Sequence, residues 1–350
     1  MKKLILLLLP ILFLAVGCGE SGDKPGEIDM AAIDTTSTFS PVPAEAPKDA
    51  KYKLQYKLEV GKTYLYKYTR LVSEEQKISA DTVMAQKVTE KRNYIFKVVP
   101  QSIESDGTME LAFTVEDISI DADANGKKVV YKGGDEVDSS KKKQFVEFIA
   151  LHKATFNVQL KPSGEIVEIF KSNKIADKML EIGANGPIAE NEKKEFYTAF
   201  SENYLKPLVM QVFKVFPEKE LAKDSSWALN LPPMNFEIFT LNSTHNYKVN
   251  GFQKNQDDFL VVIDASLMSN AVPTPAAKQN KVDLKKTAYS GSGKQYFNTD
   301  KSVLQKSATT VSMALEFSLP LPNQRTGKMI TVTQSQNSKT SNVTELLSIK

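Results

Sequence analysis

The stretch Tyr64-Leu65-Tyr66-Lys67-Tyr68 gives the first indication of the fold, because large aromatic side chains occupy every second position. Successive side chains of a β-strand point to opposite faces, so these tyrosines are expected to share one face. The same alternation returns further along the chain, in Tyr94, Phe96 and Val98, and in Leu111, Phe113 and Val115. Aromatic and β-branched residues at alternate positions, separated by turns such as Ser105-Asp106-Gly107, indicate antiparallel hairpins.

A helical period replaces this alternation between residues 171 and 220. Gly183 is expected to end a first helix, because glycine commonly follows the last helical turn. A second helical stretch, from about residue 189 to residue 215, carries an apolar stripe of Phe196, Phe200, Tyr204, Leu208 and Val212. Pro207 is expected to kink or divide this stretch, because proline lacks the backbone N–H that a helix interior uses.

From Ser226 to the C-terminus the strand pattern resumes, with Gly291-Ser292-Gly293 interpreted as a flexible turn. The chain is therefore predicted to have an α+β fold: a strongly curved, half-barrel-like antiparallel β-sheet with a central helical insert packed on its concave face. One arrangement has an N-terminal β module (51–170), the helical insert (171–220) and a C-terminal β module (221–350). A single continuous sheet with inserted helices explains the same pattern, and the sequence leaves both open.

The N-terminus has the features of a secretory signal. Two lysines precede an apolar run from Leu4 to Val16, which contains Pro10 and is shorter than the roughly 20 apolar residues of a membrane-spanning helix. Small residues then lead to Cys18, the single cysteine of the chain. This segment resembles the lipobox of bacterial lipoproteins. The resemblance implies a signal peptide at residues 1–17, cleavage between Gly17 and Cys18, and a diacylglyceryl anchor on the Cys18 sulfur.

Residues 18–50 are rich in glycine, proline and polar side chains, which is typical of a flexible tether. We therefore expect a protein of the cell envelope, held to a membrane by its lipidated cysteine. The acidic residues Glu20 and Asp23, which lie just after Cys18, favour the outer membrane or the cell surface over the inner membrane.

The charge of the chain argues against a nucleic-acid partner. The formal net charge is +3, and removal of Lys2 and Lys3 with the signal leaves about +1. Nucleic-acid binding depends on neutralising phosphates, which a nearly neutral chain does poorly. With Cys18 lipidated, no thiol is left for a disulfide, a metal site or a nucleophile.

The sharpest local motif is Asp121-Ala122-Asp123-Ala124-Asn125-Gly126, which resembles the first half of a calcium loop. Asp121, Asp123 and Asn125 would supply the ligands. The position where such a loop has a bidentate glutamate is Lys132, which repels a cation, so an Asn-Gly hairpin turn is the favoured interpretation. The chain has no recognisable nucleophile, zinc or nucleotide motif, so no catalytic residue and no cofactor is predicted.

Two aromatic groups are candidates for lining a ligand cavity. They are Phe196, Phe200 and Tyr204 of the helical stripe, and Tyr64 and Tyr66 of the first strand. A helix that simply covers the apolar face of a sheet explains the same residues, and this core interpretation is favoured.

Several segments together resemble a family of uncharacterised bacterial lipoproteins, the domain of unknown function 6263. They are Val60-Gly61-Lys62-Thr63-Tyr64, Pro162-Ser163-Gly164-Glu165, and Phe216-Pro217 leading to Asp224-Ser225-Ser226-Trp227. The resemblance covers about residues 52–320, and it brings no catalytic residues. Its shape is similar to that of curved-sheet carriers of lipids and lipoproteins, which is an analogy of fold only.

These observations lead to one expected function and two alternatives. The expected function is that of a non-enzymatic, membrane-anchored envelope lipoprotein that binds an apolar ligand or a protein partner in the concavity of its sheet. The first alternative is a structural or assembly subunit of an envelope complex. The second is a hydrolase without a recognisable motif.

Overall fold

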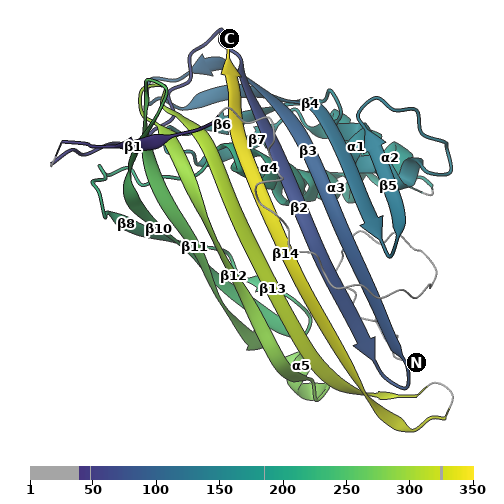
Figure 1. Ribbon diagram of the computed structural model, residues 1–350. Helices are drawn as coiled ribbons and strands as arrows, with labels where there is room; N and C mark the ends of the chain where they lie inside the picture. The colour runs from purple at the N-terminus through teal and green to yellow at the C-terminus, as the bar shows by residue number, and fades with distance from the viewer. Residues whose placement is uncertain (1–38, 48, 185, 324–325) are drawn as a thin grey trace.

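The computed structural model describes residues 39–47, 49–184, 186–323 and 326–350. Within these ranges the chain is mostly antiparallel β-structure. The strands are β1 (Val42–Ala44), β2 (Tyr64–Ser79), β3 (Val83–Ile103), β4 (Met109–Ala124), β5 (Lys127–Lys132), β6 (Thr155–Leu160), β7 (Ile166–Phe170), β8 (Ser226–Asn230), β9 (Met234–Asn235), β10 (Phe239–Asn255), β11 (Asp258–Pro273), β12 (Asp283–Asn298), β13 (Val303–Pro322) and β14 (Met329–Ile349). Together they form one 14-stranded sheet (Figure 1).

The sheet is continuous from the N-terminal to the C-terminal strands. Its order is β1-β10-β11-β12-β13-β14-β2-β3-β4-β6-β7, with β5 beside β4 and with β8 and β9 beside β10. The junction is between β14 and β2, which pair along nearly their whole length, from Thr333 opposite Ser79 to Ile349 opposite Tyr64. Of the two arrangements that the sequence left open, the single sheet is therefore the one formed. The domain boundaries at residues 170 and 220 stay predictions.

The sheet is open and is not strongly curled (Figure 1). The expectation of a strongly curved, half-barrel-like sheet is therefore wrong. Closure needs bulges and kinks placed along the strands. The pairs β2–β3 and β13–β14 have no register shift, so this part of the sheet is regular. Register shifts lie in the pairs β3–β4, β10–β11 and β12–β13, and at the end of β14.

The helices lie mostly at one end of the sheet (Figure 1). They are α1 (Val146–Leu151), α2 (Asn173–Gly183), α3 (Glu190–Phe200), α4 (Lys206–Val212) and the short α5 (Pro275–Gln279). The predicted helical insert is thus present, and α2 ends at Gly183 as expected. A π-helical turn, Ser201–Leu205, separates α3 from α4, and Pro207 lies in the first turn of α4, directly after the π-helical turn.

The two faces of the sheet differ, and the face toward α1–α4 is called here the helix-facing side. Tyr64, Tyr66 and Tyr68 lie on it and are at most 4% exposed, so their shared face is confirmed. The main core packs this end of the sheet against α1–α4, and includes Phe96, Phe113, Phe148, Phe200, Val209, Val249, Ile263 and Phe297. A second, smaller cluster lies near α5, and includes Phe239, Leu241, Leu315 and Phe317.

The end of the predicted tether pairs with the sheet. Val42–Ala44 forms β1, with Val42 opposite Lys254 and Ala44 opposite Phe252 of β10. The predicted signal peptide, Gly17 and the proposed lipidation site Cys18 lie outside the described residues. None of the helices in the described ranges has the length and apolar character that crossing a bilayer requires.

Candidate functional site

The helix-facing side carries a patch of small side chains between its two apolar clusters. We call this patch the central stripe, and it consists of Ala265 of β11, Gly291 and Gly293 of β12, and Ser307 and Thr309 of β13. The pairing places them together, because Ala265 lies opposite Gly293 and Gly293 lies opposite Thr309. Directly paired residues of antiparallel strands share a face. The stripe therefore continues across the three adjacent strands β11, β12 and β13.

Close approach of the neighbouring backbone explains why the stripe contains glycines. A Cβ on Gly293 would lie 2.3 Å from the carbonyl oxygen of Ala308, and one on Gly291 would lie 2.9 Å from that of Thr310. Strand β12 thus runs too close to β13 for either position to hold a side chain. The consequence on the helix-facing side is a sheet surface with little side-chain cover, and Ala265, Gly291, Gly293 and Thr309 are half-buried.

One flank of the stripe is aromatic. Trp227 of β8 stacks on Tyr247 of β10, with ring centroids 5.1 Å apart and planes 15° from parallel. The Tyr247 hydroxyl lies 3.2 Å from Nδ1 of His245. Burial raises the pKa of Tyr247 to about 12. Burial, together with the positive charge of nearby Lys214, lowers the pKa of His245, so its imidazole is uncharged at neutral pH.

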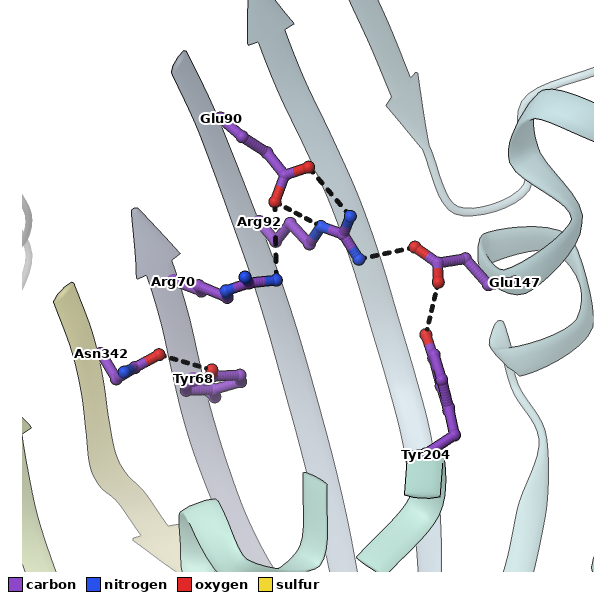
Figure 2. Close-up of polar contacts among 7 residues, drawn as sticks. All are labelled: Tyr68, Arg70, Glu90, Arg92, Glu147, Tyr204 and Asn342. Atoms are coloured by element: carbon purple, nitrogen blue, oxygen red, sulfur yellow. Dashed lines mark hydrogen bonds and ion pairs between the residues drawn. The ribbon is translucent and has the colours of Figure 1, made fainter. Parts of the chain in front are cut away.

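The other flank is a network of charged and polar side chains (Figure 2). Arg92 donates from Nε to Oε1 of Glu90 at 2.6 Å and from Nη2 to Oε2 at 2.9 Å. Its Nη1 donates to Oε1 of Glu147 in α1 at 2.6 Å, and the Tyr204 hydroxyl donates to the other oxygen of Glu147 at 3.0 Å. Arg70 lies 3.8 Å from Glu90, at the edge of the network.

Arg92 is the centre of this network and stays charged. Its side chain is only 8% exposed. Burial by itself lowers the pKa of Arg92, but the hydrogen bonds and negative charges of Glu90 and Glu147 outweigh burial and raise it. Each charge is thus compensated by another charge of the same network. The network fixes α1 and the turn that contains Tyr204 to β3, and we assign it a positioning role.

Buried polar atoms without hydrogen-bond partners lie beside the stripe. Gln295 is 3% exposed, and its Oε1 is buried and has no partner. The Nε1 of Trp227 is buried and unpartnered in the same way. Most buried polar groups in native proteins are paired, so each exception calls for a partner such as a water molecule or a ligand.

The residues expected to line a cavity lie in the main core. Tyr64 and Tyr66 are 2% and 1% exposed. Phe196, Phe200 and Tyr204 form one stack along α3 and the turn after it, with successive ring centroids 6.1 Å and 5.5 Å apart. The structure thus places them where the core interpretation expects them, and joins Tyr204 to the network through Glu147. Their part in lining a ligand cavity stays a prediction.

The opposite face of the sheet carries an open depression of about 460 Å³. It is lined by Phe39, Pro41, Ser292, Gly293, Lys294, Tyr296, Lys306, Ala308 and Thr310. None of the aromatic residues that the sequence analysis selected is among them.

The Asp121–Gly126 segment forms the hairpin turn between β4 and β5. Asn125 and Gly126 have positive φ angles of 53° and 82°, as the Asn-Gly hairpin turn requires. Two of the calcium-loop candidates use their oxygens for backbone hydrogen bonds: Asp123 accepts from the Gly126 amide of the turn at 2.7 Å, and Asn125 accepts from the Lys87 amide of β3 at 2.8 Å. The turn interpretation is confirmed. Within the described ranges, no three His, Cys, Asp or Glu side chains gather as metal ligands.

Sequence reasoning missed the central stripe. Gly291-Ser292-Gly293 was expected to be a flexible turn, but it lies inside β12, so that expectation is wrong. Glycines inside a strand pattern are a signal of close backbone approach, and here this signal was present in the sequence.

Comparison with known proteins identifies the family. Residues 106–303 match the family of unknown function DUF6263. The chain belongs to the DUF6263 family. This match lies within the range of about 52–320 over which the sequence resemblance was seen. No curated protein matches the sequence.

Several solved structures are distantly similar to this chain. A structure titled for lipid–protein interactions in lipovitellin is 8% identical with a TM-score of 0.40, and the match covers 84% of this chain and 26% of that one. An outer membrane channel from Pseudomonas putida F1 is 8% identical with a TM-score of 0.17, covering 87% and 100% of the two chains. OccK11 (OpdR) from Pseudomonas aeruginosa is 6% identical with a TM-score of 0.17, covering 83% and 99%. The chain thus spans about a quarter of the lipovitellin chain.

Proposed function

We propose that this DUF6263 protein is a non-enzymatic, lipid-anchored lipoprotein of the cell envelope that binds an apolar ligand on the helix-facing side of its sheet. The anchor is a diacylglyceryl group on Cys18, which holds the protein at the outer membrane or the cell surface. The binding surface is the central stripe together with its aromatic flank.

The proposal is based on the gap between the two apolar clusters that cover the helix-facing side. The main core covers one end of this side and the second cluster covers the other. Between them the stripe presents five small residues, four of them half-buried, bordered by the Trp227–Tyr247 stack. Ligand sites are mostly apolar surfaces with a few placed polar groups, and this composition fits one.

The polar groups around the stripe favour binding over catalysis. His245 has the Tyr247 hydroxyl beside its Nδ1, and neither residue forms a hydrogen bond with a carboxylate or a serine. The carboxylates of the other flank, Glu90 and Glu147, are taken up by Arg92 and Tyr204. A nucleophile and a base within hydrogen-bond reach, which is the signature of covalent catalysis, are not brought together here.

Native mass spectrometry tests the proposal on the chain from residue 18 onward, purified without organic extraction. The unmodified protein is expected to carry a bound lipid that organic solvent removes. Ala265→Phe, which fills the stripe, is expected to abolish this mass addition. The matched control is Ser266→Phe, because Ser266 is the next residue of the same strand and points to the opposite face, where it is exposed. Loss of the lipid from both variants, or its absence from the unmodified protein, contradicts the proposal.

A role as an assembly subunit is favoured by one other observation. Val83, Met84 and Met329 are 61%, 56% and 63% exposed, and they lie at the ends of the β2–β3 and β13–β14 hairpins, far from α1–α4 (Figure 1). Exposed apolar groups of this kind often contact a partner. Crosslinking in membranes followed by pull-down is expected to yield a stoichiometric protein partner that Met84→Lys removes. If no such partner is found, this alternative fails.

A further inference from the structure

We infer that the ligand of the central stripe has an uncharged head with a hydrogen-bond donor, such as a hydroxyl group, and that Oε1 of Gln295 accepts this hydrogen bond. The inference rests on the proposed function and adds the chemical class of the ligand. Long-chain alcohols and acylglycerols with a free hydroxyl belong to this class. Hydrocarbons, ethers and fully esterified lipids do not.

Gln295 is placed to contact a molecule on the stripe. It lies on β12, with Ile263 of β11 on one side and Ser307 of β13 on the other. Both neighbours are buried, at 0% and 3% exposure. Along its own strand, the next residue on the same face is Gly293, which has no side chain. The space next to the Gln295 amide is therefore the space above the stripe.

The amide oxygen of Gln295 is buried without a hydrogen-bond partner. Its Oε1 forms no hydrogen bond within the structure, although only 3% of the residue is exposed. An unpaired buried acceptor is costly to keep, whereas an apolar side chain of similar size at this position would carry no such cost. A ligand that donates a hydrogen bond to Oε1 removes the cost, and it gains specificity because an analogue without the donor leaves the oxygen unpaired.

The surroundings of Gln295 select an uncharged donor. Its cross-strand neighbours Ile263 and Ser307 carry no charge, and the same holds for Gly293 and Phe297 along the strand. The charged network begins at Arg70 on β2, three strands away from β12, or about 14 Å at the usual strand spacing. Lys214, the cation near His245 on the aromatic flank, donates from Nζ to the Met210 carbonyl oxygen at 2.7 Å. An ionised carboxylate only accepts hydrogen bonds, so it has nothing to donate to Oε1. A hydroxyl group meets both conditions.

Two probes that share a dodecyl chain test the inference: dodecanol, which has the donor, and dodecyl methyl ether, in which a methyl group replaces the hydroxyl hydrogen. Their affinities are measured by calorimetry on the delipidated chain from residue 18 onward, with Cys18→Ser to prevent lipidation. The unmodified stripe is expected to bind dodecanol about tenfold more tightly than the ether. Gln295→Leu is expected to remove this preference by weakening dodecanol binding alone. Gln305→Leu is the control and is expected to keep the preference, because the Gln305 amide is already partnered by Asn298 and the Leu346 carbonyl.

The outcomes separate this inference from the proposed function. Equal binding of both probes by the unmodified protein, or a preference that survives Gln295→Leu, overturns the inference and leaves the proposed function standing. Binding of neither probe overturns the proposed function. Unfolding of the ligand-free variant gives a second check: Gln295→Leu is expected to raise the midpoint of urea unfolding. A lower midpoint means that Oε1 has an internal partner such as a water molecule, and this overturns the inference.

Discussion

Arg92 of β3 and Glu147 of α1 form a buried ion pair, with 2.6 Å between Nη1 and Oε1, that joins the sheet to the helical layer. The two residues are 55 positions apart in the chain. Their side chains are 8% and 9% exposed. Removal of Arg92 leaves the Glu147 carboxylate buried without a cation, whereas removal of Glu147 leaves Arg92 paired with Glu90 alone.

Glu147→Gln is therefore expected to lower the free energy of unfolding by about 1.5–3 kcal/mol, because it removes one charge-assisted interaction while Glu90 still compensates Arg92. Urea unfolding followed by circular dichroism measures the change. Lys161→Met is the control, because it breaks an exposed pair with Glu165, at 2.9 Å, and is expected to change stability by about 0.5 kcal/mol or less. Equal effects of the two variants would show that the network is not a structural tie.

The free energy of unfolding is expected to decrease as the pH is lowered, because His245 titrates. Burial, aided by the charge of Lys214, lowers the pKa of His245 in the folded state below its ordinary value of 6.5. The unfolded chain then binds a proton first, so the stabilisation is complete above about pH 6.5 and is lost as pH falls toward the folded-state pKa. Urea unfolding between pH 7.5 and about pH 5 is expected to show this slope, and His245→Gln is expected to flatten it. A slope that is unchanged in the variant means that His245 is not its source.

Gly293→Ala is expected to destabilise the protein by about 1–3 kcal/mol, because its Cβ would lie 2.3 Å from the Ala308 carbonyl oxygen and strand β12 would have to move. Thermal and urea unfolding measure the loss. Gly251→Ala is the matched control, since Gly251 also lies in a strand and nothing lies within 4 Å of the Cβ position. If Gly293→Ala is as stable as Gly251→Ala, close approach of the backbones does not explain the glycines of the stripe.

Cys18→Ser is expected to release the protein from membranes, because Cys18 is the single cysteine and the variant has no thiol to which a lipid is attached. Two or three acyl chains on one residue hold firmly, whereas a single chain binds only marginally. Fractionation of cells, with the mass of the N-terminal peptide as a second readout, checks the result. Continued attachment of the variant to membranes would count against the anchor.

The local elements of the fold follow from the sequence more directly than the site does. The spacing of Tyr64, Tyr66 and Tyr68 predicts both their strand and their shared buried face, and Gly183 and Pro207 mark real helix boundaries. These features depend on neighbours within a few positions. The pairing of β14 with β2 joins residues more than 250 positions apart, as in the Gln336–Glu74 hydrogen bond, and no local pattern encodes it.

The site was harder to predict because its residues lack large side chains, and because Oε1 of Gln295 lacks a hydrogen-bond partner. Gly291 and Gly293 have the composition of a turn, and only the close approach of β13 shows why a strand holds them. Gln295 is polar in sequence and gives no sign of burial. Tyr64 and Tyr66 were candidates because large aromatic residues often line ligand cavities. Such residues also form hydrophobic cores, and both lie in the main core.

Photolabelling tests the central claim, ligand binding at the central stripe, most directly. A long-chain alcohol with a diazirine in its tail is irradiated with the delipidated protein, and the labelled residues are mapped by mass spectrometry of peptides. The account predicts label on β11 and β13 within residues 263–267 and 307–311, displaced by excess dodecanol and absent from Ala265→Phe. Label at the exposed hairpin ends near Val83 and Met329, with none on the stripe, would contradict it.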